Sequence, residues 1–236
     1  RAAPHAGPLG PFYRACEQEL VGATLARISQ KKQDEETKQS LIMFQANKFC
    51  PATSHLPQDY EAKIKKLGGV LEVVPIQVFT NNCRASLDLV VFHGLPAQQL
   101  KTARHLQLIE GSWDQFERER KSAIVGQSLA RRRGLKPGQP FAIGEANVIV
   151  AGIFAADTRG EEQFLYCHLE FLQRTPGLNS VGSVTQFEVQ LNDGVDPDTV
   201  ARSIDESFRA GPIVTDTRTK GVFEQNAVGD LVELIG

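Results

Sequence analysis

The sequence predicts an α+β fold in which two βαβ-like units flank a middle region of short strands and turns. Two segments, 40–80 and 185–217, each show a strand pattern, an amphipathic helix pattern and a second strand pattern. Between them, glycines and prolines repeatedly interrupt short apolar runs. A chain of 236 residues with 41% hydrophobic residues can build one large domain or two small ones.

The first unit is introduced by residues 1–39, which read as a linker followed by a stalk-like, highly charged helix. Tyr60, Ile64 and Leu67 have the spacing of one buried helix face. Pro75 indicates that its strand is an edge strand or carries a bulge. We therefore expect strands at 40–49, 70–80 and 85–93, with a helix between the first two.

The middle region is most clearly patterned at residues 123–154, where we expect a strand, a short helix, a forced turn and a hairpin. A glycine follows the helix as a C-cap, and a Pro-Gly pair has the order of a type II turn. Alternation then places Val148, Val150, Gly152 and Phe154 on one face of the return strand. The turn signature consists of Gly126, Gly134, Pro137, Gly138 and Gly152.

The second unit begins with residues 185–191, which alternate between apolar and polar side chains. Asp196 and Pro197 have the order of a helix N-cap and first turn. The helix would bury one face, and Gly211 and Pro212 would end it before a strand at 213–217. The expected buried residues of this helix are Val200, Ile204 and Phe208.

The segment Ile-Val-Gly-x-x-Leu-Ala-Arg-Arg-x-Gly-Leu-Lys-Pro-Gly (124–138), followed by two short strands and Val-x-Gly-Ile-Phe (150–154), carries a family resemblance. It resembles the extracytoplasmic domain of MacB/FtsX-like ABC transporter permeases, and the likeness extends over residues 40–236. The resemblance implies a porter-like α+β subdomain with an inserted strand-rich second subdomain. The implied boundaries are 40–109 and 183–220 for the porter-like parts, 110–182 for the insert, and 221–236 for a helix leading toward a membrane span.

The same resemblance implies a non-catalytic role outside the cytoplasm, on the periplasmic side of the inner membrane. Such a domain would couple cytoplasmic ATP hydrolysis to export, lipoprotein release or envelope work, through binding and force transmission. Its implied partners are an ABC ATPase subunit or domain, a membrane-fusion adaptor or cargo protein, and a second permease copy in a homo- or heterodimer. A free-standing periplasmic adaptor or binding module is the alternative from another class.

The longest apolar run, residues 148–156, is nine residues long and too short to span a bilayer. We therefore expect no membrane helix within these 236 residues. The chain begins with Arg1 rather than Met, and we expect it to be a piece of a longer protein.

A serine hydrolase is the catalytic alternative, because Ser128 lies in a strand–Gly-x-Ser-x–helix context. His168 is the histidine downstream of it that would serve as the base. The adjacent pair Cys167 and His168 would point to opposite faces of a strand and so could not form a dyad.

No cofactor is expected, since nucleotide-binding glycine motifs and paired metal-ligand spacings are absent from the sequence. The net charge is −2, and the one basic cluster has acidic residues within it and no aromatic series, which argues against nucleic-acid binding. Residues 157–162 read as a solvated acidic loop or a contact surface for a partner. The basic cluster consists of Arg118, Arg120, Lys121, Arg131, Arg132, Arg133 and Lys136.

Two of the four cysteines, Cys50 and Cys83, follow the first two expected strands. If those strands are parallel neighbours, the cysteines lie at the same sheet edge and at a distance suited to a disulfide. A bridge would favour an oxidising compartment, and two free cysteines would suit the cytosol. Cys16 and Cys167 are expected to be unpaired.

Overall fold

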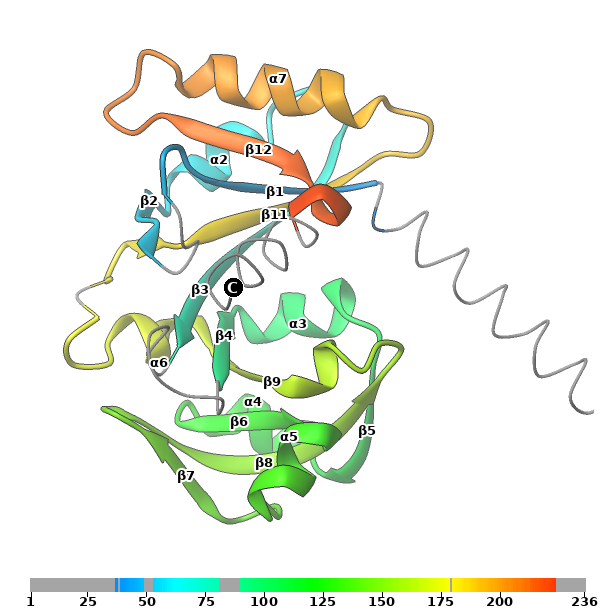
Figure 1. The fold of residues 1–236 in the computed structure, drawn as a ribbon, viewed down its shortest axis with the longest axis vertical. Coiled ribbons are helices and arrows are strands. Elements are labelled where there is room, and N and C mark those ends of the chain that lie inside the picture. The colour runs from blue at the N-terminus through cyan, green and yellow to red at the C-terminus, as the bar shows by residue number, and fades with distance from the viewer. Residues whose placement is uncertain (1–36, 38, 49–52, 81–89, 179, 224–236) are drawn as a thin grey trace, which may run out of the picture.

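The computed structural model describes residues 37, 39–48, 53–80, 90–178 and 180–223, and these form an α+β fold (Figure 1). One mixed sheet of ten strands runs through the molecule in the order β12-β1-β11-β3-β4-β9-β6-β8-β5, with β7 paired to β8. The long strand β3 (Val70–Thr80) belongs to two parts of this sheet, because residues 70–76 pair with β11 and residues 77–80 pair with β4. It therefore divides the molecule into two halves.

The porter-like half contains β12, β1, β11 and residues 70–76 of β3, with helices α2 and α7. β1 pairs antiparallel with both β11 and β12, and β11 pairs antiparallel with β3. Each βαβ unit is thus split, since a strand of the other unit lies between its two parallel strands. The bounds are β1 Ser40–Gln45, α2 Tyr60–Ile64, β11 Gln186–Leu191, α7 Pro197–Phe208 and β12 Thr215–Thr219.

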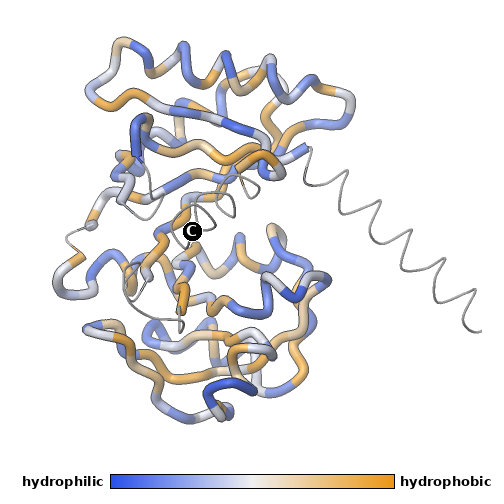
Figure 2. The backbone as a smooth tube through the Cα atoms, in the orientation of Figure 1, coloured by the Kyte–Doolittle hydropathy of each residue, from blue (hydrophilic) through white to orange (hydrophobic). Residues whose placement is uncertain are grey.

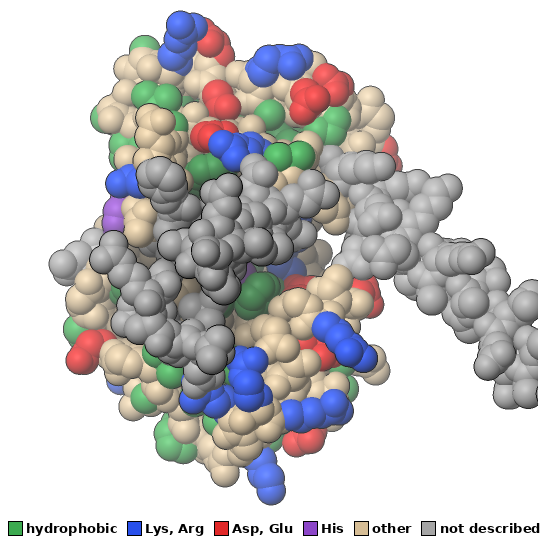
Figure 3. Space-filling view, in the orientation of Figure 1, with side chains coloured by type: hydrophobic (Ala, Val, Ile, Leu, Met, Phe, Trp, Pro, Cys, Tyr) green, Lys and Arg blue, Asp and Glu red, His purple; other side chains and the backbone are tan. Residues whose placement is uncertain are grey.

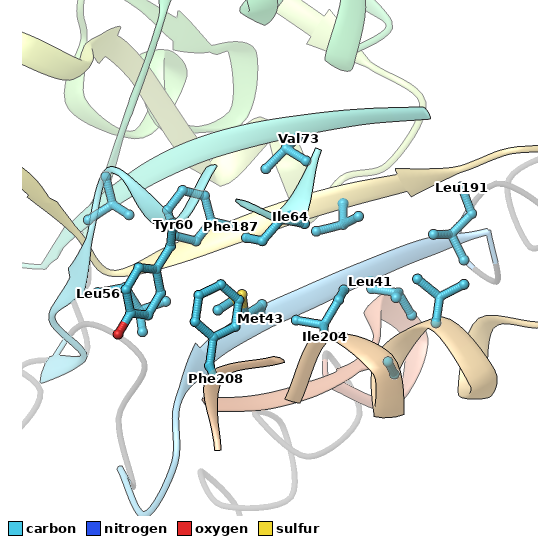
Figure 4. Packing of buried hydrophobic residues seen from close by; sticks show 14 of the residues in the cluster. Leu41, Met43, Leu56, Tyr60, Ile64, Val73, Phe187, Leu191, Ile204 and Phe208 are labelled. Atoms are coloured by element: carbon cyan, nitrogen blue, oxygen red, sulfur yellow. The ribbon is translucent and has the colours of Figure 1, made fainter. Parts of the chain in front are cut away.

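The core of this half lies between the sheet and its two helices, as Figure 4 shows. The expected helix faces are correct: Tyr60 and Ile64 are buried on α2, and Ile204 and Phe208 on α7. The rings of Tyr60 and Phe208 stack with centroids 4.1 Å apart, which joins the two helices. The Asp196 side chain caps α7 by accepting a hydrogen bond from the Thr199 backbone.

The inserted half contains residues 77–80 of β3 and the strands β4, β9, β6, β8, β5 and β7, which are hydrophobic over much of their length (Figure 2). β4 pairs with β9 and β5 pairs with β8, so residues before 110 already belong to this half. We therefore infer that the inserted region starts earlier than its expected boundary. The bounds are β4 Val91–Leu95, α3 Ala97–Ala103, β5 Leu106–Gly111, α4 Trp113–Arg118, β6 Ser122–Gly126, α5 Gln127–Arg133, β7 Pro140–Ile143, β8 Ala146–Ala156, η2 Glu161–Gln163, β9 Phe164–His168 and α6 Leu169–Gln173.

The return strand β8 differs from the simple alternation that its sequence predicts. Val148 and Val150 pack into one core cluster, whereas Phe154 packs into another on the opposite face. The cause is a register shift against β6, where Ala123 faces Val150 but Ile124 faces Gly152. An extra residue in a strand reverses the face of every residue after it.

A small second sheet joins β2 (Leu56–Pro57) to β10 (Ser183–Val184) near the return from the inserted half. Thr185, which follows β10, is fully buried and bridges the point where β3 changes partners. Its hydroxyl accepts from the Val78 N–H at 2.9 Å and donates to the Ile76 carbonyl at 3.0 Å. The side chain thereby continues the backbone ladder between the two halves.

The stalk-like helix expected within residues 1–39 and the helix expected at 221–236 lie outside the described residues, apart from residues 37, 39 and 221–223. Among the described residues, no helix is both long and apolar enough to cross a membrane.

Candidate functional site

The predicted hydrolase pair does not come together. The Ser128 hydroxyl on α5 donates to a Glu162 carboxylate oxygen at 2.7 Å. The His168 Nε2 lies 2.7 Å from the Phe116 carbonyl oxygen, and its ring stacks on the Phe116 ring. A nucleophile and its base must lie within hydrogen-bond reach. Here β6 pairs antiparallel with β9, so His168 lies beside the start of β6, whereas Ser128 follows the end of that strand. The hydrolase interpretation is therefore wrong for this arrangement.

The cysteines offer no reactive thiol within the described residues. Cys167 is free and fully buried on β9, and burial raises the pKa of its thiol far above the ordinary value. Cys16, Cys50 and Cys83 lie outside the described residues. The premise of the predicted Cys50–Cys83 bridge is not met, because β11 separates β1 from β3, and the bridge stays a prediction.

The glycine turn signature has a structural role at each of its described positions. Gly134 is the C-cap of α5 with φ +65°, and the Gln139 N–H closes the Pro137–Gly138 turn on the Lys136 carbonyl. Gly126 and Gly152 are sites of close approach between chain segments. A Cβ at Gly126 would lie 2.2 Å from the Glu162 carbonyl oxygen, and one at Gly152 would lie 2.7 Å from the Glu110 carbonyl oxygen.

The basic cluster lies on the inserted half, where Figure 3 shows several Lys and Arg side chains. Arg120 forms an ion pair with Glu170 at 2.9 Å, and Arg132 donates a hydrogen bond to the neutral side chain of Gln163. Within the part of the chain that the structure describes, no group of three or more His, Cys, Asp or Glu side chains could hold a metal ion.

The most distinctive chemistry lies instead at the junction of the two halves, in six side chains that we call the junction cluster. Its centre is an ion pair between Arg104, directly after α3, and Glu188 on β11. Two guanidinium nitrogens donate to the two carboxylate oxygens, at 3.0 and 2.5 Å. Lys220, directly after β12, donates to the same carboxylate at 3.3 Å. The cluster consists of His93, Arg104, Glu161, Tyr166, Glu188 and Lys220.

The acidic loop supplies another member of this cluster. Glu161 accepts a hydrogen bond from the Tyr166 hydroxyl at 2.7 Å and lies 3.6 Å from the Arg104 guanidinium. Its neighbour Glu162 is bonded to Ser128. Two of the acids in the expected solvated loop are therefore held by the inserted half, which overturns that interpretation for them.

Burial and neighbouring charges shift the pKa values of the ionisable groups in the cluster, and for Glu188 the two effects are opposed. The side chains of Glu188 and Arg104 are only 2% and 8% exposed. Burial alone would raise the pKa of Glu188, but Arg104 and Lys220 outweigh burial and lower it to about 2. Burial also lowers the pKa of His93 to about 3, and Arg104 adds to this effect. The cluster is thus fixed in one charge state, with ionised Glu188 and neutral His93, throughout the neutral pH range.

Sequence reasoning did not find this cluster. Residues 185–191 were expected to form a strand with alternating faces, but alternation does not show whether the polar face is buried. The partner of Glu188 lies 84 residues away, beyond the reach of any local pattern. The available signal was a charged side chain in a strand of strong β-formers, which is unusual when the strand is central.

Comparison with known proteins agrees with this architecture. No curated protein sequence matches the chain. The periplasmic region of MacB from Actinobacillus actinomycetemcomitans aligns with a TM-score of 0.57 and 14% identity, over 81% of this chain and 93% of that one. The extracellular domain of the noncanonic ABC-type transporter YknZ from Gram-positive bacteria aligns with a TM-score of 0.53 and 15% identity, over 76% and 99% respectively.

These two likenesses show a shared fold. The MacB-like periplasmic core domain family matches residues 20–207, which is most of the chain and includes every strand of the sheet except β12. The expected resemblance is confirmed, and the chain belongs to the MacB-like periplasmic core domain family.

Proposed function

We propose that this chain couples ATP hydrolysis in the cytoplasm to work outside the membrane, by binding partners and transmitting force rather than by catalysis. As a member of its family, it is the periplasmic or extracellular region of a membrane permease. The ATPase would act through the rest of that permease, as a separate subunit or domain. Two copies would assemble as a homo- or heterodimer around an adaptor or a cargo protein.

The observation that carries this proposal is the closeness of the two ends of the described part of the chain. A Cβ at Gly221 would lie 3.4 Å from the Thr37 side chain. β1 and β12 are also neighbours, with Leu41 opposite Thr219. The first and last described segments therefore lie side by side, as a domain inserted between two membrane helices requires. Both connections lie on the porter-like half, and the inserted half is reached only through it.

Membrane fractionation of the native gene product tests the first part of the proposal. We expect apolar segments of about 20 residues on both sides of the domain, carbonate-resistant membrane association, and co-purification of an ABC ATPase. A product released from membranes by carbonate would contradict the permease assignment and would favour the adaptor class.

Locking the two ends together tests the force-transmission step. The substitutions Thr37→Cys and Gly221→Cys, cross-linked to each other in the full permease, would prevent these two positions from moving apart. We expect ATP-driven transport to stop and to return after reduction, whereas either single cysteine leaves transport unchanged. Transport that continues in the cross-linked protein would contradict the proposal.

A further inference from the structure

The junction between the halves has an apolar part and an ionic part. The apolar part surrounds β3, where Val74 and Ile76 share a buried cluster with Leu95 and Leu100. The ionic part is centred on Glu188, whose carboxylate is shared by Arg104 of the inserted half and by Lys220. One side chain thus links three segments that are distant in the sequence.

The two cations are not equivalent partners of this carboxylate. Arg104 makes a two-point contact and is nearly buried, whereas Lys220 makes one contact at 3.3 Å with 27% of its side chain exposed. Both donate to the same oxygen, Oε1. Movement of Lys220 therefore changes the charge balance that Arg104 experiences, without breaking the main pair.

Helix α3 connects this carboxylate to the rest of the inserted half. Arg104 follows the helix directly, and Gln99 within it donates to the Val73 carbonyl at 3.0 Å. Leu100 of the same helix is fully buried in the apolar part of the junction. A displacement of the Arg104 backbone therefore moves the end of α3.

We propose that Glu188 is the centre of an ion-pair latch that holds the inserted half against the porter-like half and ties both to the segment after β12. A buried ion pair suits this task, because removal of one partner leaves the other charge buried and uncompensated. It also restricts the geometry more tightly than apolar contacts do, since the guanidinium and carboxylate must meet in one plane. The latch is a property of this chain, and only its use in transport rests on the proposed function.

The single tryptophan of the sequence, Trp113, makes the latch measurable. It lies in α4 of the inserted half and packs near Phe116. Its fluorescence therefore follows the unfolding of that half, whereas far-ultraviolet circular dichroism follows the whole chain. If the halves are latched, both signals should show one coincident urea transition.

Glu188→Gln retains the shape of the side chain and removes its charge. We expect the two urea transitions to separate in this variant, and amide exchange in residues 97–103 to rise about tenfold or more. Glu206→Gln is the matched control, because its pair with Arg209 is exposed on α7, and both transitions should remain coincident. Lys220→Gln should separate the fluorescence and circular dichroism transitions less than Glu188→Gln does. If Glu188→Gln does not fold, Lys220→Gln takes its place in the test.

Separated transitions in the unmodified chain would overturn the latch. So would coincident curves with unchanged midpoints and unchanged exchange in Glu188→Gln. Failure of the proposed function has a different signature. If Lys220→Gln loosens the isolated chain but leaves ATP-driven transport by the full permease unchanged, the latch stands and force transmission through it is contradicted.

Discussion

Acidification should weaken the fold through one partly buried histidine, His93, at a pH where most carboxylates are still ionised. Its ring lies between the aromatic rings of Phe164 and Tyr166, at centroid distances of 4.7 and 5.6 Å. Its Nδ1 is buried and finds no hydrogen-bond partner among the residues that the structure describes. Burial, Arg104 and Lys220 lower its pKa to about 3, against the opposing effect of Glu188.

The direction and size of the effect follow from proton binding. A folded-state pKa below the unfolded value of 6.5 means that the unfolded chain binds more protons as the pH falls. Stability is therefore lost progressively from pH 6.5 down to about 3. At pH 5 the His93 pKa of the unfolded chain lies about 1.5 above the pH, so the unfolded state holds a proton that the folded state does not bind. This difference lowers the free energy of unfolding by about 2 kcal/mol.

Glu188 makes a small and separate contribution in this interval. Its pKa falls from 4.5 in the unfolded chain to about 2 in the fold, so its stabilisation is present above pH 4.5 and is lost below it. Between pH 7 and pH 5 it accounts for only about 0.2 kcal/mol. The histidine therefore dominates the loss between these two pH values at the junction.

Urea unfolding followed by Trp113 fluorescence at pH 7 and pH 5 measures this loss. His93→Phe retains a flat ring and removes the titration, so we expect the loss between the two pH values to shrink by about 2 kcal/mol. His105→Phe replaces an exposed histidine nearby and should retain the loss of the unmodified chain. Equal losses in the unmodified chain and in His93→Phe would refute the reasoning.

Three further substitutions test the packing, each by its urea midpoint. Gly126→Ala should cost about 1–3 kcal/mol, because its Cβ would meet the Glu162 backbone at 2.2 Å and backbone cannot rotate away; an unchanged midpoint would contradict this close approach. Gly134→Ala has open space but a φ of +65°, so we expect a loss of about 1–2 kcal/mol from conformation alone, and a larger loss would indicate an unrecognised contact. Phe208→Ala should cost about 3–5 kcal/mol, since it removes the stack on Tyr60 and opens a cavity under α7; a loss below 1 kcal/mol would show that the core closes over it.

The sequence predicts part of the local structure of this chain. The strand expected at 40–49 ends at Gln45, and the described strand near the one expected at 85–93 spans Val91–Leu95. The strand at 70–80 has the same limits in the structure, and the helix from Pro197 has its expected cap and buried face. The turns around Gly134 and Gly138 have the positive φ that their sequence context favours. These features depend on neighbours along the chain, and local propensity and capping therefore determine them.

The order of strands could not be predicted in the same way. Nothing in residues 40–80 shows that β11, more than 100 residues later, lies between β1 and β3. The same alternating pattern is compatible with β1 beside β3 and with β1 beside β11. The argument for a Cys50–Cys83 bridge assumed that β1 and β3 are neighbours. Pro75 was informative, because the part of β3 that contains it pairs on one side only, with β11.

The junction cluster shows a second limit. Arg104 and Glu188 each read locally as solvent-exposed charges, and only the folded chain places both in the interior. The strength of their electrostatic interaction depends on exclusion from water, which is a property of the tertiary structure. A polar face that is buried between two halves is therefore hidden from any argument based on alternation.

The sharing of β3 by both halves also determines which relative motions the protein permits. A hinge formed by a loop allows two bodies to separate, but here the bodies are joined through the ladder of one strand, with Thr185 at the point where its partners change. Pulling the halves apart within the plane of the sheet would break backbone hydrogen bonds one after another. Rotation about the strand axis is much less costly, because neighbouring strands tolerate a wide range of twist. The domain should therefore respond to load by twisting about β3. The angle between its halves changes, while the distance across β3 stays constant.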